Sequence, residues 1–310
     1  MGHAITIFAG SSGLNTKLDP VRTRFNPDTG IAEMQVAVNV ELDDTGRVSR
    51  RKGYEATAVT DPVHSLWCDG KDAYCVTGGN LCRINGDLTL SVLETVQADA
   101  QVSYAMAGNR TYYINGFQKG ILENGAASDW AMDGYEGPVT NKELMDPPMG
   151  RIVRYFAGRM WIAEKNVLWF SQPGAYAWFR RGTDAFMFDD DVLMVEAVAD
   201  GLWVSTVSKL WFLSGVNPEE MHQQRVTDYP AVEGTACRVP GRDVGSAIRE
   251  DIGDGSLPGW VWVFVTAEGV CLGGPGGYLR NLTQDKVVLP VGRYGSAVYD
   301  GGKYIACMET

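Results

Sequence analysis

The sequence lacks any run of about 18 apolar residues, which is the length that a helix needs to cross a bilayer. Its first ten residues lack the basic start and the apolar stretch of a secretory signal. These two absences predict a protein that is made in the cytoplasm and is not inserted into a membrane. Basic residues are also scarce, 27 against 38 acidic ones, for a net charge of −11. Because phosphate binding depends on Lys and Arg, this balance argues against a generic nucleic-acid-binding protein.

Metal and redox motifs are missing as well. The six cysteines contain no C-x-x-C pair, and only three histidines are scattered along the chain. Cys68, Cys75 and Cys82 are spaced by seven residues and are expected on three successive strands, where small buried side chains explain them better than a metal or a disulfide. We therefore predict no metal site and no cofactor.

Catalytic motifs are equally scarce. The neighbouring carboxylates of Asp189, Asp190 and Asp191 lack the alternating spacing and the distal Glu of a calcium loop, so a solvated acidic turn is expected. The glycines of 273–277 lack the Gly-Lys-Ser/Thr ending of a phosphate loop, and 10–13 do not form a G-x-S-x-G elbow. We predict no catalytic residue, and the protein is expected not to be an enzyme.

What the sequence does contain is a repeat, in which a glycine is followed two to four residues later by an aromatic residue. An apolar segment precedes each unit, as expected for the first strand of a hairpin that turns at the glycine. Five of the six units continue into a third apolar segment, and the last stops before one. The units begin at Asp69, Gly108, Gly158, Asp200, Gly259 and Asp300.

The spacing of this repeat is close to the roughly 40 to 50 residues of a four-stranded propeller blade. We predict an all-β fold, a β-propeller of six blades, with five or seven as neighbouring possibilities. An open β-sandwich array or two small β domains are the alternatives.

A hairpin precedes the first unit, with alternating residues on both sides of Asp43-Asp44-Thr45-Gly46. Because the last unit lacks its third strand, we expect this hairpin to pair with the C-terminal strands and close the ring. The predicted organisation is an N-terminal arm (1–33) and a propeller (34–310), composed of the closing hairpin (34–60) and the blades (61–310).

The leading segment resembles a known family. A Gly near a Pro-Arg segment, an Ala-x-Asn strand, an Asp-x-Gly-Arg turn and an Arg-Gly-Tyr exit follow one another within about 45 of the 310 residues, in 13–22, 37–47 and 50–54. This order is similar to the opening of the tail-accessory proteins of short-tailed bacteriophages, the packaged-DNA stabilisation or tail-nozzle family.

The resemblance implies a structural virion protein at the tail or head-to-tail junction. It implies a homo-oligomeric ring, with six copies expected, that holds packaged DNA and later passes it without sequence preference. The implied partners are other head-tail or tail proteins: the portal, the adaptor, and a tail fibre or spike.

Two groups of residues are candidates for such a role. Basic side chains in the arm and the hairpin are suited to subunit docking by bidentate Arg contacts, or alternatively to shielding an edge strand: Arg22, Arg24, Arg47, Arg50 and Arg51. Acidic loop residues are candidates for a channel wall that repels DNA, or alternatively are only solvated: Asp189, Asp190, Asp191, Glu219 and Glu220.

Two other functions remain open. A propeller that binds or cleaves glycans would need carboxylates and aromatic residues gathered at one end of its channel. An intracellular scaffold propeller that binds peptides would be a monomer.

Overall fold

The computed structural model describes residues 10–26, 29–43, 45–53, 61–68, 70–132, 144–245, 248, 259–284, 286–290 and 292–309. Asp44, residues 54–60 of the expected closing hairpin and Asp69 lie outside this set. The described part is nearly all-β, and its strands are joined by turns and short 3-10 helices. None of its helices is long and apolar enough to span a membrane.

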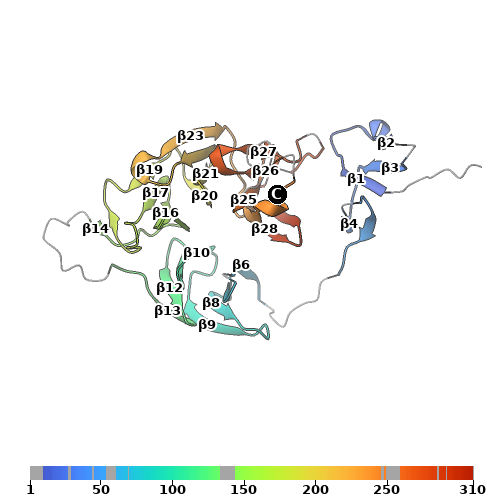
Figure 1. Cartoon of the computed structure of the whole chain (residues 1–310). Helices are drawn as coiled ribbons and strands as arrows, with labels where there is room; N and C mark the ends of the chain where they lie inside the picture. The colour runs from blue at the N-terminus through green and yellow to red at the C-terminus, as the bar shows by residue number, and fades with distance from the viewer. Residues whose placement is uncertain are drawn as a thin grey trace, which may run out of the picture.

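Five antiparallel sheets of four strands follow one another along the chain, and we number them sheets 1 to 5. Figure 1 shows them arranged one after another around a common centre, which is the architecture of a β-propeller. Sheet 1 contains β6 (Val63–Cys68), β7 (Ala73–Thr77), β8 (Asn80–Ile84) and β9 (Leu90–Thr95). Sheet 2 contains β10 (Ser103–Ala107), β11 (Arg110–Ile114), β12 (Lys119–Glu123) and β13 (Ala126–Asp129).

Sheets 3 to 5 repeat this order. Sheet 3 contains β15 (Ile152–Phe156), β16 (Arg159–Glu164), β17 (Val167–Phe170) and β19 (Ala185–Met187). Sheet 4 contains β20 (Val192–Val198), β21 (Gly201–Thr206), β22 (Leu210–Ser214) and β23 (His222–Thr227). Sheet 5 contains β24 (Cys237–Pro240), β25 (Trp260–Thr266), β26 (Gly269–Gly273) and β27 (Leu279–Asn281). A two-stranded pair, β14 (Leu144–Met145) with β18 (Phe179–Arg180), lies beside them.

The last sheet has only two strands, β28 (Tyr294–Asp300) and β29 (Lys303–Glu309). All six predicted glycine–aromatic units fall where the first strand of a sheet turns into the second, from β6–β7 to β28–β29. Five of the six unit glycines have positive φ, a conformation that favours glycine, as at Gly158 (φ 75°) and Gly301 (φ 54°); Gly201, the first residue of β21, does not. The repeat therefore predicted the sheets correctly, while the number of blades in a closed ring stays a prediction.

Five apolar clusters fill the spaces between successive sheets, from sheets 1 and 2 to sheet 5 and the last sheet. The aromatic residue of the repeat lies at the centre of several of them, and Trp161 and Trp203 are fully buried. Since a single sheet cannot cover both its faces, this stacking supplies the core. Within the described residues, none of the five clusters joins the last sheet to sheet 1.

The first strands of sheets 2 to 4 are also tied by a polar network. Arg154 in β15 donates two hydrogen bonds to Glu196 in β20, at 2.8 and 2.7 Å, and a third at 2.8 Å to the Ser103 hydroxyl in β10. The Glu196 side chain is only 3% exposed. Because the three residues occupy first strands of adjacent sheets, the network fixes the register between those sheets.

The predicted pairing of the 34–60 hairpin with the C-terminal strands is not found among the described residues. The hairpin forms a sheet of its own from β4 (Val40–Leu42) and β5 (Val48–Arg50), and β28 and β29 pair with each other. The physical reason is a competing contact: Ser11 donates its N–H to the Gly46 carbonyl at 2.7 Å, which holds the hairpin turn against the preceding sheet. Ring closure stays a prediction.

Candidate assembly site

The described residues between 10 and 53 form a unit that we call the N-terminal module. Besides the β4–β5 hairpin it contains β1 (Gly10–Leu14), the 3-10 turn Pro20–Arg22, β2 (Phe25–Asn26) and β3 (Ile31–Met34). β3 pairs with β1 in parallel and with β2 in antiparallel fashion. Part of the predicted N-terminal arm (1–33) is therefore a small sheet. In Figure 1 it lies outside the ring of sheets, next to the end where β27 and β28 are found.

A buried polar pair stabilises this module. Asn15 donates its side-chain amide to the Glu33 carboxylate at 3.0 Å, and both residues are more than 90% buried. The Asn15 side-chain oxygen accepts the backbone N–H groups of Lys17 and Leu18, each at 3.2 Å. Because these bonds satisfy the amide on both sides, they fix the turn that follows β1.

The hairpin turn is organised by Asp43. Its Oδ1 accepts the Thr45 hydroxyl at 2.6 Å and the N–H groups of Thr45 and Arg47, both at 2.9 Å. These bonds, that of the Thr45 hydroxyl first, lower the pKa of the Asp43 carboxyl. Gly46 has positive φ (80°), and a Cβ there would lie 2.7 Å from the Ser11 carbonyl oxygen. The position therefore requires glycine for two reasons, backbone conformation and close approach.

The module is fastened to the segment between β27 and β28. Thr16 donates its N–H to the Lys286 carbonyl at 2.8 Å, and its hydroxyl accepts the Val288 N–H at 3.0 Å. Lys286 in turn donates to the Ser12 carbonyl at 3.2 Å, and Lys17 donates to the Gln284 carbonyl. Contacts between residues about 270 positions apart thus join the start of the chain to its end.

One ion pair links the hairpin to the last sheet. The Glu41 carboxylate accepts a hydrogen bond from the Lys303 ammonium group at 3.0 Å, which lowers the pKa of Glu41. Lys303 is the first residue of β29, directly after the turn from β28. The hairpin therefore touches the tip of the last sheet rather than its edge.

The five arginines proposed for docking all lie in the N-terminal module. Arg22 ends the 3-10 turn, Arg24 precedes β2, Arg47 follows the hairpin turn, and Arg50 ends β5; all four are exposed. Among the described residues these four form no salt bridge. Arg51 is half-buried, and its N–H extends the hairpin by bonding to the Asn39 carbonyl.

The acidic residues proposed for a channel wall are separated by the fold. Asp189 and Asp190 lie between β19 and β20 and are tied to the β21–β22 turn, Asp189 to Lys209 at 2.5 Å and Asp190 to Ser208. The Asp191 carbonyl accepts the Val207 N–H. Glu219 and Glu220 lie in the 3-10 turn between β22 and β23, at the opposite end of the same strands. The two groups therefore do not form one acidic surface on a single copy.

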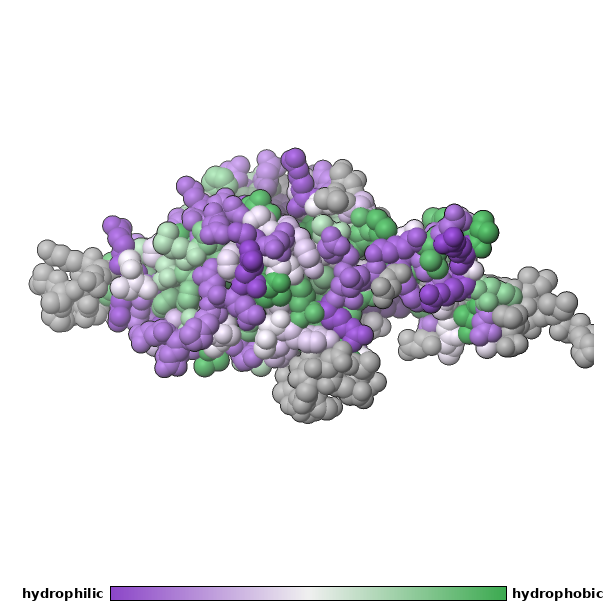
Figure 2. Space-filling model, turned by 90° about the horizontal axis from the view of Figure 1, so that it is seen from above, coloured by the Kyte–Doolittle hydropathy of each residue, from purple (hydrophilic) through white to green (hydrophobic). Residues whose placement is uncertain are grey.

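Several apolar side chains are exposed at the module and at the last sheet. In the module, Val21, Val36 and Val38 are 93%, 75% and 76% exposed. On one face of the last sheet, the paired residues Val298 and Ile305 are 53% and 41% exposed. Figure 2 shows the module, on the right, with hydrophobic and hydrophilic residues side by side. Exposed apolar groups mark an interaction surface where they form a contiguous patch, as the paired Val298 and Ile305 begin to do.

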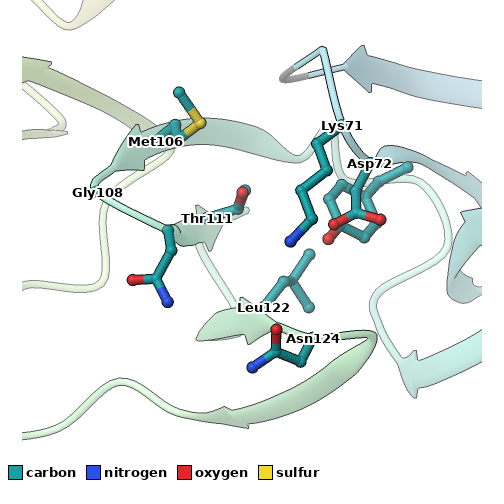
Figure 3. Close-up of a pocket in the computed structure, with 9 residues that line it drawn as sticks. Lys71, Asp72, Met106, Gly108, Thr111, Leu122 and Asn124 are labelled. Atoms are coloured by element: carbon teal, nitrogen blue, oxygen red, sulfur yellow. The ribbon is translucent and has the colours of Figure 1, made fainter.

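Two pockets lie between sheets. The first, about 200 Å³, is found between sheets 1 and 2, where Lys71 extends over Leu122 toward its middle (Figure 3). Asp72 in its wall accepts a hydrogen bond from Arg83 at 2.5 Å. Ligand pockets usually enclose about 300 to 1,000 Å³, so this one is small for a substrate.

The second pocket, about 350 Å³, lies between sheets 3 and 4 and includes Glu219. It is lined by two arginines, Arg159 and Arg180, and by two carboxylates, Asp184 and Glu219. The Asp184 carboxylate accepts hydrogen bonds from the Arg180 N–H at 3.1 Å and the Thr183 hydroxyl at 3.2 Å, so it positions a loop. Within the part of the chain that the structure describes, no group of three or more His, Cys, Asp or Glu side chains could hold a metal ion.

Several contacts were not predicted from the sequence. The Arg154–Glu196 pair could have been predicted, because both are charged residues within otherwise apolar first strands of the repeat. The bonds of Thr16 and Lys17 to residues 284–288 could not be predicted, since each joins the start of the chain to main-chain groups of a loop about 270 residues away. Cys75 and Cys82 are buried as expected, and face each other across β7 and β8, whereas Cys68 is exposed.

Several solved structures resemble this chain at low sequence identity. Solved structures that resemble this chain include virginiamycin B lyase from Staphylococcus aureus (10% identity, 87% of this chain and 84% of that one, TM-score 0.49). A gluconolactonase from Xanthomonas campestris (12%, 80% and 83%, 0.49) and the WD40 β-propeller domain of Doa1 (9%, 72% and 69%, 0.43) also match. The chain spans about a third or less of the BT4673 extracellular domain from B. thetaiotaomicron, at 10% identity, 29% of that chain and a TM-score of 0.45.

At identities of 9–12% and TM-scores below 0.5, these likenesses carry no argument about what the protein does. No family model matches the chain, and no curated protein matches it.

Proposed function

We propose that this chain is a structural protein of a tailed-bacteriophage virion, a head-to-tail connector or tail-nozzle component. Its copies form a ring around the DNA channel, which helps to retain packaged DNA and later passes it. The observation that carries the proposal is the N-terminal module. The residues that resemble the tail-accessory family form a separate unit outside the ring of sheets, with exposed arginines and exposed valines.

The open last sheet supports an assembly role. β29 presents an unpaired edge among the described residues, and an unpaired edge is a template for pairing with another chain. A propeller that works alone gains nothing from such an edge. A subunit of a ring can use it for contact with its neighbour.

The charge of the chain is compatible with passage of DNA. A net charge of −11 on each copy, repeated around an axis, favours a lumen that repels phosphate groups. The acidic side chains at the two opposite ends of sheet 4 would then line different levels of the channel, with Asp189, Asp190 and Asp191 at one level and Glu219 and Glu220 at the other.

Deletion of the gene from its parent phage genome tests the proposal. We expect heads that fill and then lose DNA, or particles whose tails stop short, in electron micrographs and in an assay of retained DNA. Complementation with the wild-type chain should restore infectious particles. Normal, infectious virions from the deletion would contradict the proposal.

A variant and its control test whether the N-terminal module docks the protein into the particle. Replacement of Arg47 and Arg50 by Ala should reduce incorporation into particles, because these exposed residues lie in the module. Arg242→Ala is the matched control, since this arginine is 86% exposed but lies in the turn after β24. Its incorporation should equal that of the wild type.

A further inference from the structure

We propose that the β4–β5 hairpin of one copy completes the last sheet of a neighbouring copy, as its third and fourth strands. β29 and the hairpin both end in unpaired edges within the described residues, since each belongs to a two-stranded sheet. This exchange deepens the proposed function, because it rests on the ring of copies and names the contact that joins them.

The position of the hairpin in the chain supports this assignment. In each complete sheet the fourth strand is followed by a connection to the first strand of the next sheet, and these connections contain from four residues (188–191) to 22 (130–151). The hairpin is followed by residues 51–62, 12 in number, and then by β6 of sheet 1. It therefore stands where the third and fourth strands of the last sheet belong.

The dimensions of the hairpin agree with this role. β5 has three residues, as do β19 and β27, which are the fourth strands of sheets 3 and 5. One face of the hairpin is mostly apolar, because Val40, Leu42 and Val48 share it; the exposed Arg50, which is paired with Val40, lies on the same face. Hydrogen bonding to β29 would extend the sheet and place this apolar face beside one of its existing faces.

Exposed apolar side chains on both sides of the gap between the last sheet and sheet 1 would favour completion of the last sheet. Val298 and Ile305 lie on the open face of the last sheet, and Leu66 and Val92 of sheet 1 are 68% and 63% exposed. Each of the other gaps between successive sheets is filled by a buried apolar cluster. A complete last sheet would supply the area that is needed to bury these groups.

A neighbouring copy is a better donor than the same chain. The hairpin is held to β1 through Ser11 and Gly46, and the turn after β1 is held to its own residues 284–288 through Thr16 and Lys17. These contacts keep the hairpin at the tip of its own last sheet, where Glu41 accepts a hydrogen bond from Lys303. Pairing with its own β29 would break them, whereas pairing with another copy's β29 leaves the module folded.

The chain supplies a natural probe for this contact, because Cys307 lies exposed in β29. One population of the full-length protein carries Cys68→Ser and Cys307→Ser together with a single new cysteine in β4, made in turn by Val40→Cys, Glu41→Cys and Leu42→Cys. A second, size-tagged population carries Cys68→Ser and retains Cys307. Neither chain can form the β4–Cys307 disulfide with itself.

The two populations are mixed, allowed to assemble and oxidised with glutathione disulfide. We expect a disulfide-linked heterodimer on a non-reducing gel, in the ring-sized fraction, for at least one of the three positions, since neighbouring strands bring Cα atoms within the range that a disulfide spans. Val21→Cys is the matched control, because it exposes a thiol in the same module away from β4. It should give at least tenfold less heterodimer.

Two results would overturn the exchange. They are rings without a heterodimer at any of the three positions, and a protein that remains a monomer. The phage deletion is independent of this experiment. Leaking particles together with rings that lack the heterodimer reject the exchange alone, whereas normal virions together with a heterodimer reject the virion role alone.

Discussion

Sheets 3 and 4 and the last sheet are built from the same hairpin repeat, yet they differ in what covers them. In sheets 3 and 4 the aromatic residues Trp161 and Trp203 are fully buried between neighbouring sheets. In the last sheet, Tyr304 packs toward sheet 5, while Val298 and Ile305 on the other face are exposed. The repeat thus provides an apolar face in every sheet, and whether this face becomes core depends on the presence of a next sheet.

The largest expected effect distinguishes a buried from an exposed tryptophan. Trp203→Ala removes a fully buried ring and its 2.9 Å hydrogen bond to the Gly274 carbonyl, and should lower the free energy of unfolding by about 4 kcal/mol. Trp260→Ala, at a ring that is 42% exposed and covered by Arg238, should cost about 1 kcal/mol. Urea titration measures both, and equal losses would show that the two regions are packed alike.

The next comparison uses two salt bridges between an arginine and a glutamate, one buried and one exposed. Glu196→Gln leaves Arg154 without its carboxylate between sheets 3 and 4, and should destabilise the fold by about 3 kcal/mol. Glu123→Gln breaks the solvent-exposed Arg110–Glu123 pair and should cost less than about 1 kcal/mol. Thermal unfolding of the two variants is the measurement. A milder effect at Glu196 than at Glu123 would contradict the structural role of the Ser103–Arg154–Glu196 network.

A smaller effect is expected at two glycines that share positive φ. Gly46→Ala introduces a Cβ 2.7 Å from the Ser11 carbonyl oxygen and should displace the hairpin from the small sheet of the module. Gly301→Ala has no atom within 4 Å of its Cβ and should cost only about 1 kcal/mol, through its backbone strain. Limited proteolysis should cut residues 10–53 much faster in Gly46→Ala than in Gly301→Ala. Equal rates of cleavage would argue against the Ser11–Gly46 contact as the anchor of the hairpin.

Acid should loosen the hairpin before it affects the sheets. The pKa values of Glu41 and Asp43 are lowered by hydrogen bonds from Lys303 and Thr45, from ordinary values of 4.5 and 3.8. Since the folded state favours the charged carboxylates, their contribution is complete above those ordinary values and is lost as the pH falls through the lowered ones. Asp43→Asn should remove most of this pH dependence of hairpin signals in NMR spectra. An unchanged acid response in Asp43→Asn would assign it to other groups.

The sequence predicts the parts of this fold that depend on neighbouring residues. A glycine followed closely by an aromatic residue is a local pattern, so all six hairpins were found, and the apolar segments that follow revealed the third strands of sheets 1 to 5. The Asp43–Gly46 turn was found for the same reason. The partner of that hairpin was not, because it depends on the approach of Ser11 to Gly46.

The candidate site is less predictable than the fold. The arginines of the module were recognised as unusual in an acidic chain, but their exposure depends on how β1 to β5 fold. Asp189 and Glu219 looked equivalent as acidic loop residues, yet the antiparallel order of β20 to β23 places them at opposite ends of sheet 4. β2 has only two residues, too few for a periodic signal.

The central claim is that sheets 1 to 5 are complete in one copy, whereas the last sheet and the hairpin are completed by assembly. Hydrogen–deuterium exchange of the dilute and the assembled protein tests this claim most directly. We expect the amides of β16, β21 and β25 to be protected in both states, and those of β29 and β4 to gain protection only on assembly. Amides of β29 that are as protected in the dilute protein as those of β21 would contradict the account.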